Sequence, residues 1–224
     1  MKKLDDELDD LQNRLSEMAD LARSMVVLAA NAVKDRTFDA FAEMSESESK
    51  LNQMQTDIDH EAIRLLTVYG PVASDLRYLL VSTHVTSQLE RMGDQAVNVC
   101  EALRLMRSDP ARQPTLANVR KMGDLACQMV DDALDAFFSR NEAKAVTTRR
   151  RDDVVDAMNH QVAKELLTDE AQGEVSPQVG GTADVVAQIL TARCLERIAD
   201  QAKNICKQVV YLVRAEDVRH VRPQ

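Results

Sequence analysis

Apolar residues recur at intervals of three and four positions along most of this chain. Leu21, Met25, Leu28 and Ala32 follow this spacing, which places them on one face of a helix. Prolines fall between such stretches and not within them, as expected because proline disrupts the interior of a helix. The pattern predicts six helices, at about 5–36, 40–68, 73–107, 115–139, 142–171 and 182–216.

One segment of the chain occurs twice. Glu90–Cys100 returns as Glu196–Cys206, with seven of the eleven positions identical. The similarity extends to the preceding helices, where an offset near 104 aligns Leu21 with Leu125. A repeat fixes the structural unit of a fold, and this unit contains three helices. The sequence therefore predicts an all-α protein of two tandem, pseudo-symmetric three-helix bundles with antiparallel helices.

The domain boundaries follow from this repeat. We expect the first three-helix repeat at 1–109 and the second at 115–217, joined by the short segment that contains Pro110 and Pro114. A basic C-terminal tail occupies 218–224. Such basic runs are usually solvated.

The composition fits a helical protein that does not bind nucleic acid. Of the 224 residues, 45% are hydrophobic but only 3% are aromatic, so the core must consist mainly of aliphatic residues and methionine. The formal net charge is −9. This charge argues against nucleic acid as a general partner, because such binding depends on neutralising phosphates.

Neither a signal peptide nor a membrane span is expected from the sequence. The first seven residues lack an apolar stretch, and the run Met25–Val33 is interrupted by Asn31 and too short to cross a bilayer. The four cysteines show no C-x-x-C spacing. Two of them, Cys100 and Cys206, occupy the same place in the two repeats, which predicts buried thiols in a reducing compartment, so a cytoplasmic protein is expected.

Acidic residues form a row in each repeat. Glu90 and Asp94 lie one helical turn apart, and Asn52 and Glu90 lie 18 and 20 residues from Gly70 on either side of the turn. At about 1.5 Å per residue, two antiparallel helices bring these positions to the same height. The first acidic row is predicted to contain Glu48, Asn52, Glu90 and Asp94. By the same count, the second acidic row contains Asp152, Asp156, Glu196 and Asp200.

Carboxylates at one height repel each other unless a positive charge lies among them. Arginine is one possible source of that charge, and Arg77, Arg91 and Arg197 are near in sequence. A metal ion is the other, since all-oxygen ligation suits hard cations such as Mg²⁺, Ca²⁺, Mn²⁺ or iron. No phosphate loop, nucleophile elbow or zincin motif occurs. No catalytic residue is therefore predicted, and the protein is not expected to be an enzyme.

The chain resembles the PhoU family, the phosphate-specific transport system accessory proteins. The resemblance rests on Glu90-Arg91-x-x-Asp94-x-x-x-Asn98 and its second copy from Glu196 to Asn204, on Pro71-x-Ala73-Ser74-Asp75-Leu76-Arg77 and on Arg219-His220-Val221. It implies two three-helix bundles, and it implies transition-metal ions or clusters (iron, zinc or manganese) on the paired carboxylates. Asn52 stands where the family pattern expects an acid, so the second acidic row is the better candidate.

The resemblance also implies a regulatory role. Proteins of this family repress the phosphate-starvation response when phosphate is plentiful. The implied partners are the ATPase subunit of the phosphate ABC transporter, the phosphate-sensing membrane histidine kinase and a second copy of the chain in a homodimer. Two alternatives remain open: a metal store or metal-dependent enzyme that uses the acidic rows, and a helical scaffold whose acids are paired with arginine.

Overall fold

The computed structural model describes residues 2–36, 41–106, 117–171 and 181–217. Every regular element in these ranges is an α-helix. The seven helices are α1 (Lys2–Asp35), α2 (Phe41–Tyr69), α3 (Ala73–Arg104), α4 (Ala117–Phe138), α5 (Glu142–Arg149), α6 (Asp152–Ala171) and α7 (Thr182–Arg214).

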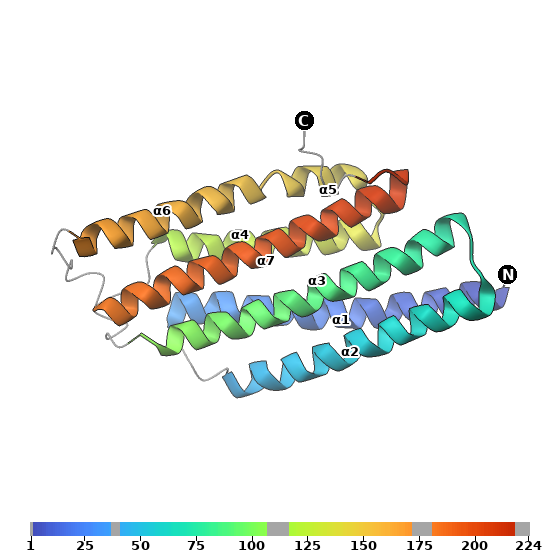
Figure 1. Cartoon of the computed structure of the whole chain (residues 1–224), viewed down its shortest axis with the longest axis horizontal. Coiled ribbons are helices and arrows are strands. Elements are labelled where there is room, and N and C mark those ends of the chain that lie inside the picture. Colours follow the sequence, from blue (N-terminus) through green and yellow to red (C-terminus); the bar gives the residue numbers. More distant parts are fainter. Residues whose placement is uncertain (1, 37–40, 107–116, 172–180, 218–224) are drawn as a thin grey trace.

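The helices form two elongated groups that lie side by side (Figure 1). In the first group, α1, α2 and α3 pack on one another, and in the second, α4, α5 and α6 pack against α7. The groups meet where α3 packs against α7 and α1 against α4. This arrangement confirms the predicted all-α fold of two three-helix bundles.

One predicted helix is divided. The expected helix at 142–171 consists of α5 and α6, which follow one another along the same edge of the molecule (Figure 1). The chain turns at Arg150–Arg151, and the Arg151 carbonyl accepts hydrogen bonds from the amides of Val154 and Val155 at 3.0 and 3.4 Å. Asp152 therefore lies in a first helical turn, where the helix dipole favours a carboxylate.

The turn between α2 and α3 was expected at Gly70-Pro71, and the structure places it there. Gly70 has a φ of 52°, a left-handed conformation that glycine adopts without steric cost, and its amide donates to the Leu66 carbonyl at 3.2 Å. The turn sets the two helices antiparallel. The predicted linker and the basic tail at 218–224 lie outside the described residues.

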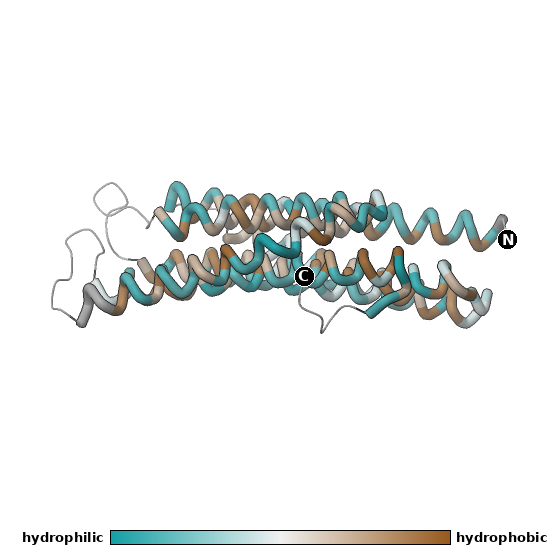
Figure 2. Tube along the Cα trace, turned by 90° about the horizontal axis from the view of Figure 1, so that it is seen from above, coloured by the Kyte–Doolittle hydropathy of each residue, from teal (hydrophilic) through white to brown (hydrophobic). Residues whose placement is uncertain are grey.

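The core follows the predicted apolar spacing. Met25, Leu51 and Leu89 are fully buried, together with many alanines and methionines from other helices and with Val155, Val162 and Leu166 of α6. Hydrophobic and hydrophilic positions alternate along every helix (Figure 2), as expected for amphipathic helices that share a core. Among the described helices, none is long and apolar enough to cross a membrane.

Close packing in the first bundle depends on Gly93. A Cβ atom at this position would lie 2.5 Å from Leu51 Cδ2 of α2 and 3.4 Å from Met25 Cε of α1. The missing side chain therefore lets α2 and α3 approach each other next to Glu90 and Asp94. The second bundle has buried Ala199 at the equivalent position.

Candidate functional site

The structure brings together three members of the first acidic row. Glu48 on α2 and Glu90 and Asp94 on α3 are all partly buried. Burial raises the pKa of Glu48, and the negative charge of Asp94 adds to the effect. The pKa of Glu90 is also raised, first by burial and then by Asp94 and Glu48. The carboxylates of α2 and α3 thus face each other, as the helix count predicted.

The first row differs from the prediction in two residues, Asn52 and Glu101. Asn52 is exposed, and its backbone carbonyl accepts the Thr56 hydroxyl at 3.1 Å. Glu101, which the sequence argument missed, is close enough to help raise the pKa of Glu48. Its position seven residues after Asp94 is the helical spacing that could have revealed it.

The second acidic row is also assembled in space. Burial raises the pKa of Glu196, and the charges of Asp156, Asp200 and Asp152 contribute in that order. These acids come from α6 and α7, which pack together. Asp152 is the most buried member, with 1% of its surface exposed.

A lysine lies among the carboxylates of the second row. Lys203 Nζ donates a hydrogen bond to Asp152 Oδ2 and lies 3.6 Å from Asp200 Oδ1. Partial burial lowers the pKa of Lys203, but its bond to Asp152 and the charges of Asp152, Asp200 and Asp156 outweigh this and raise the pKa. Lys203 therefore carries a positive charge inside the row.

A second lysine, Lys207, is connected to the second acidic row by hydrogen bonds through Asn204, the asparagine of the repeated motif. Lys207 Nζ donates to Asn204 Oδ1 at 2.8 Å, and Asn204 Nδ2 donates to Asp200 Oδ2 at 3.2 Å. The pKa of Lys207 is lowered by burial first and then by the nearby charge of Lys203. Asn204 thus links Lys207 to Asp200 by two hydrogen bonds. This link is a physical role for the asparagine of the repeated motif.

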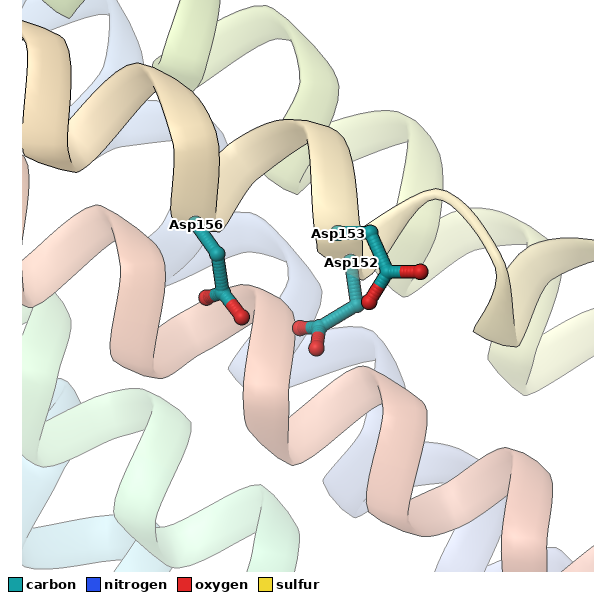
Figure 3. Close-up of side chains that lie close together, drawn as sticks. All are labelled: Asp152, Asp153 and Asp156. Carbon is teal, nitrogen blue, oxygen red and sulfur yellow. The ribbon is translucent and has the colours of Figure 1, made fainter. Parts of the chain in front are cut away.

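Three carboxylates lie together at the start of α6. One oxygen from each of Asp152, Asp153 and Asp156 lies within 4.8 Å of the other two. Asp152 and Asp156 extend from α6 toward α7, and Asp153 lies beside Asp152 at the helix start (Figure 3). Asp153 is exposed. Acidic groups of this kind also occur without a metal because they favour a helix N-terminus.

The carboxylates of the second row do not fit a metal ion while Lys203 stays in place. Asp152 Oδ1 is buried without a hydrogen-bond partner among the described residues, which costs about 1–3 kcal/mol. A divalent ion about 4 Å from an ammonium is repelled by about 8 kcal/mol at an effective dielectric constant of 20. Lys203 already occupies Asp152 Oδ2 and lies beside Asp200 Oδ1, so an ion that binds both of these oxygens would have to displace Lys203.

The first row has a donor set that suits a hard cation, because its members are carboxylates from two helices. Whether iron, zinc or manganese binds either row stays a prediction. Two of the three proposed arginines, Arg91 and Arg197, are exposed. The charge of Arg91 lowers the pKa of Glu90, but burial and Asp94 outweigh it. Lys203 was not predicted from the sequence, although it stands where the first repeat has Val97, and this difference could have revealed it.

Comparison with known proteins matches both repeats to one domain family. The PhoU domain matches residues 15–103 and again residues 119–209, which together cover most of the chain. The chain belongs to the PhoU family. The two matched ranges contain both acidic rows and both lysines of the second row.

The PhoU-family relatives are similar over nearly their whole length. The chain is 33% identical to the phosphate-specific transport system accessory protein PhoU homolog of Pseudomonas aeruginosa, covering 96% of this chain and 87% of that protein. It is 30% identical to the phosphate-specific transport system accessory protein PhoU of Escherichia coli, with 96% and 87% covered. These names describe accessory proteins and not enzymes.

Solved PhoU structures share the fold. The crystal structure of PhoU from Pseudomonas aeruginosa matches with a TM-score of 0.86 at 32% identity, covering 95% of this chain and 99% of that one. The phosphate transport system regulatory protein PhoU from Streptococcus pneumoniae matches with a TM-score of 0.86 at 26% identity, covering 96% and 99%. The similarity therefore includes both bundles of this PhoU-family chain and their relative placement.

Proposed function

We propose that this protein is a regulatory accessory protein of a phosphate transport system. In this role it represses the phosphate-starvation response when phosphate is plentiful. It acts through contacts with the ATPase subunit of the phosphate transporter and with the phosphate-sensing membrane histidine kinase, and it carries out no catalysis of its own.

One observation carries the proposal: the match to proteins named for this role extends over both repeats and 96% of the chain. A match in one bundle alone would support only a shared helical module, because a fold by itself does not define a function. The long helices also offer extended charged faces. Such faces suit reversible contacts, whose rate and specificity depend on charge complementarity.

The test is a phosphate-starvation reporter in phosphate-rich medium, in cells with and without this gene. We expect the reporter to turn on when the gene is removed, because the repressor is lost. A copy supplied in trans should silence it again. A copy with Leu89→Asp should fail to do so, since Leu89 is fully buried and an unpaired charge there disrupts the core.

A reporter that stays silent without the gene would contradict the regulatory role. The partners are tested separately by capturing the purified transporter ATPase subunit and the cytoplasmic part of the kinase on immobilised protein. Capture of both supports the proposed coupling. Regulation without capture of either would show that repression occurs by another contact.

A further inference from the structure

The two acidic rows differ in charge at two positions of the repeated motif. The acids and asparagines coincide when α3 is aligned with α7 at an offset of 106, as in Glu90 with Glu196. Lys203, however, stands where the first repeat has Val97, and Lys207 stands where it has Glu101. The first row thus gains a carboxylate from Glu101, while the second row gains two ammonium groups.

The structure places the first of these ammonium groups among the acids. Lys203 is bonded to the buried oxygen Asp152 Oδ2 and lies 3.6 Å from Asp200 Oδ1. Three-quarters of the Lys203 side-chain surface is covered, since 25% is exposed. A freely solvated surface lysine would not be held between two carboxylates of different helices.

The second ammonium group is connected to Asp200 through Asn204. Lys207 donates to Asn204, and Asn204 donates to Asp200. Asp200 therefore receives an amide hydrogen bond and has an ammonium nearby. Together the two lysines supply positive charge and hydrogen-bond donors, which are what a set of facing carboxylates requires.

We infer that the second acidic row carries its own cation, Lys203, and does not require a metal ion. The lysine takes the place that a metal would hold between Asp152 and Asp200, and it joins α6 to α7. This assignment reverses the sequence-based preference for the second row as the metal site. It concerns a property of the purified protein and does not depend on the proposed regulatory function.

The inference is tested by Mn²⁺ binding to the purified full chain after chelator treatment and dialysis, measured by calorimetry and by thermal unfolding with and without Mn²⁺. The first row is neutralised throughout, so that only the second row is observed, by Glu48→Gln, Glu90→Gln, Asp94→Asn and Glu101→Gln. In this background we expect no Mn²⁺ binding at the second row. We expect Lys203→Val, which restores the residue of the first repeat, to lower thermal stability.

Addition of Mn²⁺ should then restore the stability of the Lys203→Val variant, and Mn²⁺ binding should become measurable where the background protein shows none, because a nearby positive charge is gone. Lys203→Arg is the matched control, since it keeps the charge and should not gain Mn²⁺ binding. If Lys203→Val does not fold without metal, Asp152→Asn is added. The combined variant removes both buried charges and should fold without gaining Mn²⁺ binding.

Two outcomes would overturn the inference. Mn²⁺ binding to the background protein that is lost with Glu196→Gln and Asp200→Asn would show that the row takes a metal despite Lys203. Unchanged stability and no gain in Mn²⁺ binding for Lys203→Val would show that the lysine does not act as the cation of the row. The phosphate reporter is not used here, so failure of this test leaves the regulatory proposal unaffected.

Discussion

Cys206 shows how burial controls the chemistry of a single side chain. All four cysteines are free, and burial raises the pKa of Cys206 from 9.0 to about 12. Because the thiolate is the nucleophile, we expect Cys206 to react with a disulfide reagent such as DTNB extremely slowly in the native protein near neutral pH. The measurement is a time course of thiol release, native and in denaturant, with Cys206→Ala as the control.

The pKa shift also has a consequence for stability. A thiol whose folded pKa lies above its unfolded pKa stabilises the fold below the unfolded pKa, and this contribution is lost as the pH rises through the folded value. For Cys206 the loss occurs between about pH 9 and about pH 12. Rapid labelling of a thiol in the native wild type that disappears in Cys206→Ala would contradict the prediction that Cys206 reacts slowly with DTNB.

At the scale of the helical elements, two glycines test how closely the helices pack. In Gly93→Ala the new Cβ would lie 2.5 Å from Leu51 Cδ2, a fully buried side chain. Overpacking costs about 1–3 kcal/mol, against a gain in helix propensity of about 1 kcal/mol. We expect a net loss of about 1 kcal/mol in the free energy of unfolding, measured by urea denaturation.

Gly123→Ala is the matched control within α4. A Cβ there would lie 3.4 Å from Ala30 Cβ, which is close to ordinary contact. The gain in helix propensity should therefore dominate, and stability should rise by up to about 1 kcal/mol. Equal effects of the two substitutions would contradict the close approach of α2 and α3 at Gly93.

At the scale of the whole molecule, a buried ion pair joins the two bundles. Arg36 follows α1, Asp184 lies in the first turn of α7, and Arg36 Nη2 lies 4.0 Å from Asp184 Oδ2. Both side chains are almost fully buried. Arg36→Ala should cost about 1–3 kcal/mol in the free energy of unfolding, because it removes one partner of the buried Asp184 carboxylate. Urea denaturation measures this loss.

The control for this prediction replaces both partners. Arg36→Met with Asp184→Leu removes both charges and keeps apolar volume, so it should recover more than half of the loss. A double variant as unstable as Arg36→Ala would show that removal of the arginine acts through something other than the loss of this ion pair. The comparison thus tests whether the ion pair links the two bundles.

Prediction from sequence was accurate for the helices and incomplete for the site. Apolar spacing defined the long helices because each one buries a continuous stripe, and Gly70-Pro71 marked a turn. The break at Arg150–Arg151 was missed, since no glycine or proline marks it. Both α5 and α6 pack against α7, a tertiary contact that local residue preferences do not encode.

The sequence by itself determined the repeat, the all-α fold and the pairing of carboxylates across two helices, because these follow from helical periodicity and from equal distances to a turn. Only the tertiary structure decided which charge faces those carboxylates. Lys203 is three residues from Asp200 in sequence but 51 residues from Asp152. The contact with Asp152 exists because α6 and α7 pack together, and that packing makes the lysine part of the second acidic row.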